Sequence, residues 1–145
     1  STTSQGRPES VAEHSWRVAL MAMLLSGEAE GVDLNKVLRM CVIHDLGEAI
    51  TGDIPSFWKT EADTAKEDKE MIEMKTPEAR VYKALDKLEA VLQHNEAPLS
   101  TWIPLEYELN QTYGMEEAKA SIPFLEAVRN LAVTDTKEKL QKEST

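Results

Sequence analysis

Apolar positions recur at spacings of three and four residues along most of the chain, which is the pattern of helices that bury one face. Residues 9–30 form the first such segment, and Gly31 is expected to end it. Asp33 is expected to cap a second helix by accepting a hydrogen bond from a free amide of its first turn. The two stripes also contain histidines: they consist of Val11, His14, Ser15, Val18, Met21, Ala22 and Leu25, and of Val37, Met40, Cys41 and His44.

The helical pattern breaks between residues 47 and 59, where two glycines and a proline predict a loop. The charge-dense segment 61–73 follows, and we interpret it as an exposed helix or a link. Thr76 and Pro77 then predict the N-cap and first position of a helix. Its inward face consists of Ala79, Tyr82, Asp86, Ala90 and Gln93, and two shorter helices are expected at residues 100–113 and 123–131, before a charged tail.

The composition agrees with this helical pattern. Apolar residues make up 41% and aromatic residues 6% of the 145 residues, and alternating β-branched runs are few. The length suffices for one core, so we predict a single all-α domain, a helical bundle, over residues 1–145. We interpret Cys41 as a small buried apolar residue, and the large residues expected in the core are Trp16, Met21, Met23 and Met40.

The charge balance and the single cysteine limit the partners and the compartment. Sixteen basic against 26 acidic residues give a net charge of −10, which argues against a nucleic-acid polymer as partner. One cysteine excludes an intramolecular disulfide framework, and no apolar run approaches the roughly 20 residues that span a bilayer. The first residues also lack the features of a signal peptide. We therefore expect a cytoplasmic protein with no membrane partner.

Four residues that can bind metal lie on or beside the inward faces of three predicted helices: His14, His44, Asp45 and Asp86. Buried carboxylates without partners cost several kcal/mol, so a cation is expected to meet them. One alternative is a structural ion-pair network, whose candidate cations are Arg17, Arg39, Lys83 and Lys87. The other is one divalent metal ion, for which a mixed nitrogen and oxygen shell favours Mn, Co, Fe or Ni over Mg or Zn.

Four motifs give this set a more specific meaning. They are RPESVAEHS (residues 7–15), HDLGE (44–48), TGDIP (51–55) and KALDKLEA (83–90). In this order they resemble the HD-domain metal-dependent phosphohydrolases, and in particular the branch that includes bacterial 5′-deoxynucleotidases. The resemblance covers residues 7–93. It implies an HD-domain helical bundle with a buried mononuclear metal site.

The resemblance also assigns roles to individual residues. It implies that His14, His44, Asp45 and Asp86 bind one divalent metal ion, with Glu48 and Asp53 close to the attacking water and the phosphate. Glu48 follows His44 by four residues, hence lies on the same side of a continuing helix. The non-catalytic alternative for both acids is a helix cap or a solvated loop carboxylate.

The implied reaction is hydrolysis of a phosphomonoester by a metal-activated water, and the resemblance implies the 5′-phosphate of a nucleoside monophosphate as the substrate group. Glu48 or Asp53 would act as general base or acid. Candidate cations for the phosphate are Arg7, Lys59 and Lys87, although solvated surface charge is an alternative for each. Two other functions remain open: a metal- and nucleotide-binding regulatory module without turnover, and a structural helical domain. A homodimer is compatible with the apolar first helix and an exposed patch at Trp102.

The chain departs from the family pattern at two places. Relatives usually carry a further N-terminal helix before the first motif, and a longer helical segment before the motif that contains Asp86. The resemblance therefore implies that an N-terminal helix and a segment near residues 70–75 are missing from this sequence. If both are truly absent, metal binding is expected to survive while base recognition is lost.

Overall fold

The computed structural model describes the backbone of residues 3–49 and 75–143. The all-α prediction is confirmed, since these residues form helices and no β-strand. The predicted loop after residue 49 and the charged segment 61–73 lie outside the described residues. The elements are α1 (Val11–Leu24), α2 (Leu34–Ala49), α4 (Pro77–Glu96), the 3₁₀ turn η1 (Leu99–Thr101), α5 (Pro104–Thr112), α6 (Met115–Ala120) and α7 (Pro123–Glu143).

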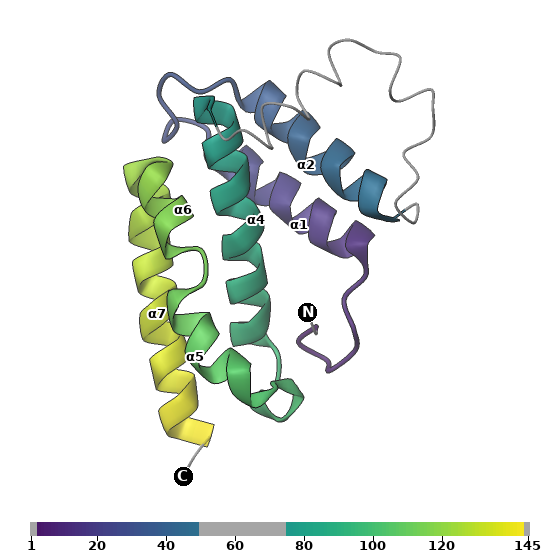
Figure 1. Ribbon diagram of the computed structural model, residues 1–145, viewed down its shortest axis with the longest axis vertical. Coiled ribbons are helices and arrows are strands. Elements are labelled where there is room, and N and C mark those ends of the chain that lie inside the picture. The colour runs from purple at the N-terminus through teal and green to yellow at the C-terminus, as the bar shows by residue number, and fades with distance from the viewer. Residues whose placement is uncertain (1–2, 50–74, 144–145) are drawn as a thin grey trace.

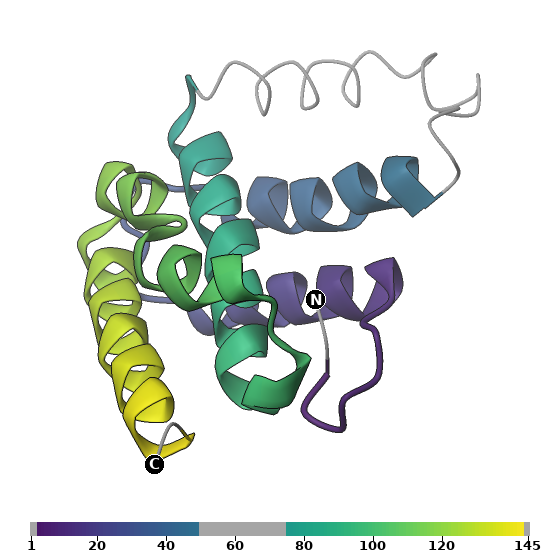
Figure 2. The ribbon, with the colours of Figure 1, turned by 60° about the horizontal axis from the view of Figure 1, so that its bottom comes forward.

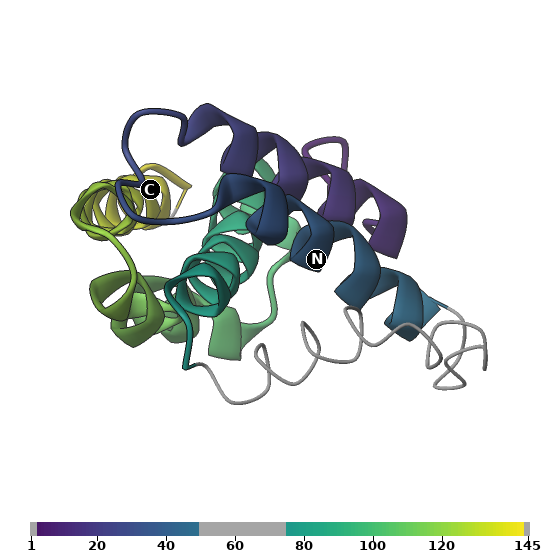
Figure 3. The same ribbon diagram turned by 90° about the horizontal axis from the view of Figure 1, so that it is seen from above.

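Helix α4 is the centre of the arrangement (Figure 1). On one side it packs against α1 and α2, which run antiparallel to each other; on the other it packs against α6 and α7. Seen from above, α1 and α2 lie side by side (Figure 3). As a result, the last turns of α2 lie beside the first turns of α1 (Figures 1 and 2).

Side-chain caps fix the starts of the three helices around the predicted site. Ser10 and Glu13 form a reciprocal capping box at α1. The Asp33 side chain accepts hydrogen bonds from the amides of residues 35 and 36, at 3.1 and 3.3 Å, which confirms the predicted cap of α2. At α4 the Thr76 hydroxyl accepts from the Ala79 amide at 3.2 Å, and Pro77 occupies the first turn, also as predicted.

Replacing Thr76 by alanine is expected to lower the free energy of unfolding by about 1 kcal/mol, because the Ala79 amide loses its acceptor. Urea denaturation followed by circular dichroism measures this change. Thr76→Ser is the matched control, since it keeps the hydroxyl oxygen and should stay close to the original stability. Equal losses in both variants would contradict the capping role.

The core lies between α1, α2 and α4 and extends to α7. Its buried residues include most apolar members of the two predicted stripes, Cys41 among them: Val18, Ala22, Leu25, Val37, Met40 and Cys41. Val11, which also belongs to the first predicted stripe, is 38% exposed. Met21 is partly buried against this core. The prediction for Trp16 and Met23 is wrong, because these side chains are 66% and 60% exposed. They lie on the face of α1 opposite the buried stripe, and the apolar pattern alone did not distinguish the two faces.

Several helix ends differ from the prediction. The first helix ends at Leu24 rather than near residue 30, and Gly27 follows it with φ +89°, a conformation that interrupts a helix. Helix α2 continues through Gly47 to Ala49, beyond the predicted break. The segment expected as a charged tail belongs to α7, which runs to Glu143. The many charged residues in this segment therefore led to the wrong expectation of a tail, although the segment is helical.

The predicted helix over residues 100–113 is shorter than expected, because residues 99–101 form the 3₁₀ turn η1 and α5 covers residues 104–112. Pro104 starts a new helix, α5, and the short helix α6 follows after Gly114, where the sequence pattern indicated none. Gly114 has φ +80°, and a Cβ atom built there would lie 2.9 Å from the Cβ of Lys87. Glycine thus allows the connection between α5 and α6 to pass directly against α4.

A polar network connects the end of α4 to the segment that follows it. Trp102 is buried, contrary to the expected exposed patch, and its indole NH donates to the His94 carbonyl at 3.0 Å. The Asn110 amide donates to Asn95 at 3.0 Å and to Thr136 at 2.9 Å. These bonds join α4 to α5 and α7, so this segment has a structural role.

Candidate metal centre

Helices α1 and α4 bring together two residues of the predicted set. His14, in the first turn of α1, and Asp86, in the middle of α4, approach each other with 2.7 Å between Nε2 and Oδ1. The other ring nitrogen, Nδ1, contacts the carboxylate of Glu89. Because Asp86 and Glu89 are three residues apart, they lie on the same face of α4 and flank one imidazole.

This arrangement determines the charge of the imidazole. Burial lowers the pKa of His14, but hydrogen bonds to Asp86 and Glu89 and their negative charges raise it more, to about 10. In the absence of another cation the ring is therefore doubly protonated at neutral pH, and each N–H faces a carboxylate. The carboxylates thus stabilise one positive charge at His14, which is carried by the doubly protonated ring or by another cation.

Two carboxylates lie on the Nδ1 side of the ring, those of Glu89 and Glu9. The Glu89 side chain is 0% exposed and the Glu9 side chain 5%. Glu9 Oε1 lies 3.8 Å from Nδ1, while Glu9 Oε2 is buried without a hydrogen bond. Burial and the neighbouring charge of Glu89 raise the pKa of Glu9 to about 7. Near neutral pH Glu9 is therefore partly protonated, which reduces the repulsion between the two carboxylates.

Arg17 supplies positive charge on the far side of Glu89. Its Nε lies 3.2 Å from Glu89 Oε1, and its Nη atoms donate to both oxygens of Glu96 at 2.8 and 3.0 Å. It also contacts the Gln93 side-chain oxygen. An ion pair of the kind that the structural alternative expects is thus present between Arg17 and Glu89.

The other predicted site residues are placed only by their backbone or not at all. His44, Asp45 and Glu48 lie in the last turns of α2, and this end of α2 lies beside the start of α1, where His14 is (Figures 1 and 2). The expectation that Glu48 shares a side with His44 required the helix to continue to Glu48, and α2 extends past this residue. Asp53 lies outside the described residues.

The donor atoms around His14 fit a divalent metal on the Nε2 side. Nitrogen and oxygen donors from two helices lie 2.7 Å apart there, close enough to share one cation. Glu9, His14 and Glu89 also offer donor atoms within 4.8 Å of one another. That group faces Nδ1, however, where Glu89 already contacts His14 with one oxygen and Arg17 with the other. The Nδ1 side is therefore already engaged by protein contacts.

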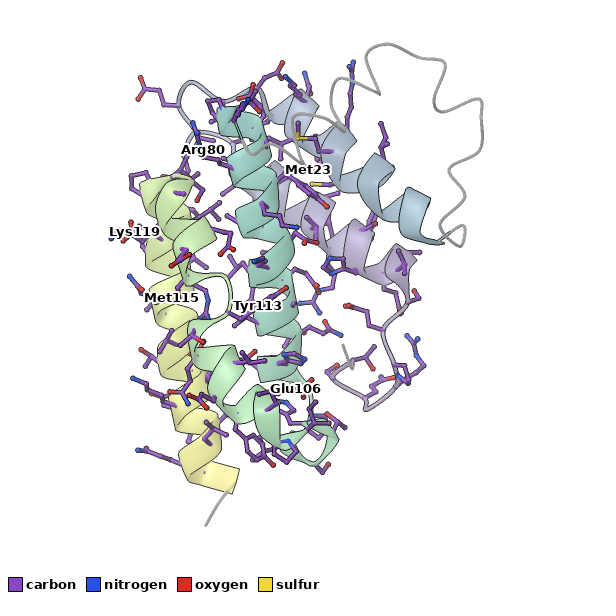
Figure 4. The ribbon with its side chains drawn as sticks, in the orientation of Figure 1. Met23, Arg80, Glu106, Tyr113, Met115 and Lys119 are labelled. Atoms are coloured by element: carbon purple, nitrogen blue, oxygen red, sulfur yellow. The ribbon has the colours of Figure 1, made fainter. Side chains whose placement is uncertain are left out.

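Two of the cations considered for phosphate binding take part in ion pairs. Arg7 pairs with Glu13, and Lys87 pairs with Glu117. The Lys87 ammonium also lies 5.1 Å from the centre of the Tyr113 ring. Tyr113 lies in the connection between α5 and α6, beside α4 (Figure 4). Lys59 lies outside the described residues.

Glu9 and Glu89 were not among the predicted site residues, although both lie inside the quoted motifs. Glu89 could have been found from its position three residues after Asp86, on the same helical face. Glu9 precedes the cap of α1, and its position in the sequence gives no sign of burial. Only the packing of α4 against α1 places it beside Glu89.

Comparison with known families decides what kind of helical bundle this is. The HD-domain family matches residues 1–74 and 69–127. The chain belongs to this family. A crystal structure of a predicted metal-dependent phosphohydrolase from Magnetospirillum magnetotacticum superposes with a TM-score of 0.71 at 27% sequence identity, covering 95% of this chain and 83% of that one. The predicted HD-domain fold is therefore confirmed.

Curated relatives of this HD-domain chain include nucleotide hydrolases. The 5′-deoxynucleotidase HDDC2 of Dictyostelium discoideum is 29% identical over 119 residues, which cover 61% of this chain and 63% of the relative. The human protein of that name is 31% identical, covering 62% and 55%. A dATP triphosphohydrolase of cyanophage S-2L is 37% identical, covering 59% and 56%. The matches thus span less than two thirds of these relatives.

Proposed function

We propose that the chain, as a single HD domain, is a metal-dependent phosphohydrolase that releases phosphate from a nucleoside 5′-monophosphate. The approach of His14 Nε2 to Asp86 Oδ1 across α1 and α4 carries this proposal, because it is the arrangement that an HD-type metal site needs. Relatives named 5′-deoxynucleotidase support the substrate class. A small phosphorylated compound, rather than a nucleic-acid polymer, also suits a chain of net charge −10.

The proposed ligands are His14, His44, Asp45 and Asp86, around one divalent ion for which Mn, Co, Fe or Ni are favoured over Mg or Zn. Such an ion lowers the pKa of a water molecule and neutralises phosphate charge. Glu48 and Asp53 are proposed to orient the attacking water or to protonate the leaving oxygen. The P–O bond to the leaving group breaks, and the products are inorganic phosphate and the nucleoside.

Phosphate release from a panel of ribo- and deoxyribonucleoside 5′-monophosphates tests this proposal. The protein is stripped with a chelator, and Mn, Co, Ni or Mg is added back singly. Release that depends on a transition metal supports the proposal. The panel also contains dATP, because one relative is a dATP triphosphohydrolase. Saturable nucleotide binding by calorimetry without phosphate release would instead favour a regulatory module.

Glu48→Ala is expected to spare metal binding and to lower kcat by about 100-fold or more, because the variant loses a proton-transfer group but no ligand. Metal binding is measured by calorimetry and turnover by phosphate release. Glu78→Ala, on the first turn of α4, is the control and should leave turnover unchanged. Unchanged turnover in Glu48→Ala would refute its role as acid or base.

We also propose a homodimer and a cytoplasmic location. Support for the dimer comes from an exposed apolar face on α1 formed by Trp16, Leu20, Met23 and Leu24. Light scattering after size-exclusion chromatography tests it, and a mass of one chain would oppose it. No helix in the described part of the chain is long and apolar enough to cross a bilayer. Cell fractionation tests the compartment.

A further inference from the structure

Glu89 is completely buried, yet the proposed reaction has no use for it as a ligand or as an acid. Its two oxygens have different partners. Oε2 contacts His14 Nδ1, and Oε1 lies 3.2 Å from Arg17 Nε. A buried carboxylate is costly unless its partners compensate for the lost hydration, so this position needs an explanation beyond packing.

The contacts run as a continuous series between α1 and α4. Glu96 holds the Arg17 guanidinium with two bonds, at 2.8 and 3.0 Å. Arg17 in turn faces Glu89, and Glu89 faces His14. The last contact joins His14 Nε2 to Asp86 Oδ1 at 2.7 Å. His14 and Arg17 are three residues apart, so the two residues that α1 contributes to this series lie on one face of the helix.

An imidazole can bind a metal through either nitrogen, and the hydrogen bond made by the other nitrogen decides which one is free. Here Glu89 lies at Nδ1, and only Nε2 faces Asp86. Arg17 engages the other oxygen of Glu89, which leaves Oε2 for His14. Glu89 and Arg17, which are not proposed ligands, thus determine the tautomer and the ring orientation of His14.

We propose that Glu89 is a positioning residue that holds His14 with Nε2 directed at the metal, and that Arg17 fixes Glu89 in this role. The inference rests on the proposed function, since it assumes that His14 binds the metal. Glu89 does not touch the substrate or the metal. Its contribution is to accept the Nδ1–H bond and so to keep the ring in one orientation and increase its basicity.

Calorimetric titration of the chelator-stripped chain with Mn²⁺ alone, without substrate, tests this role. Glu89→Gln keeps the size of the side chain but loses its charge, and it is expected to weaken Mn²⁺ binding by about 10- to 100-fold. Glu78→Gln is the matched control, because Glu78 lies in the first turn of the same helix and outside this series of contacts. It should change Mn²⁺ affinity by less than about threefold. Equal affinity in Glu89→Gln and the original protein would overturn the inference.

A second measurement uses the original protein and does not depend on how a variant folds. Long-range ¹H–¹⁵N spectra of the chain loaded with diamagnetic Zn²⁺ report which nitrogen of His14 carries the proton. The expected result is a proton on Nδ1 and metal on Nε2, whereas metal on Nδ1 would overturn the inference. Absence of any Mn²⁺ binding by the original protein would instead contradict the proposed function, so the two failures are distinguishable.

Discussion

Replacing Asp86 by alanine is expected to remove both the metal and the activity. Asp86 is the α4 residue whose oxygen meets His14 Nε2 at 2.7 Å, so the variant loses one proposed ligand and the charge that balances the cation. Loss of a ligand from a site with four protein ligands should lower metal affinity by at least 100-fold, with turnover at background. Metal content after dialysis and phosphate release under saturating substrate measure the two effects.

The thermal shift caused by metal provides a third readout of the same variant. A ligand that binds only the folded state raises its stability, so Mn²⁺ at 100 times its dissociation constant should stabilise the original protein by about 2.7 kcal/mol. Asp86→Ala should show no such shift. Glu78→Gln, which removes a charge from the first turn of the same helix, is the control and should keep the full shift. An Asp86→Ala protein that keeps full metal occupancy would refute the proposed ligand set.

Replacing Arg129 by methionine is expected to give a large loss of stability, about 3 kcal/mol. Arg129 lies on α7, is buried, and donates from Nε to the Tyr113 carbonyl and from Nη2 to the Asn110 carbonyl, both at 2.9 Å. These carbonyls lie at the end of α5, where a helix lacks internal donors and attracts positive charge. Methionine fills similar space but leaves both carbonyls without these donors.

Chemical denaturation with a common slope measures the effect of the Arg129 substitution. Lys137→Met removes an exposed cation from the same helix and is the control, for which a change within about 0.5 kcal/mol is expected. The Arg129 variant should keep its metal affinity, because α7 contributes no proposed ligand. Equal stability of the two variants would show that the buried guanidinium is not needed to complete α5.

The sequence determined the helices near the site and their starting points. Spacing of apolar residues indicated α1, α2 and α4, and Asp33 and Thr76 marked helix starts because their side chains satisfy amides within three residues. The motifs containing His14, Asp45 and Asp86 also indicated an HD domain, because each motif is short and is recognised from its residue types and their order. Such local signals can be interpreted without knowing how the helices pack.

The tertiary structure decided the features that depend on which faces meet. Trp16 and Val18 are both apolar and lie on the same helix, but only the packing of α1 against its neighbours determines which of them is buried. The contact between His14 and Glu89 joins residues 75 positions apart, and it forms only because α4 packs against α1. Helical periodicity defines a face but not its partner, because the partner follows from the crossing of whole helices. Residue types thus determined the chemistry of this site, and packing determined the environment that supports it.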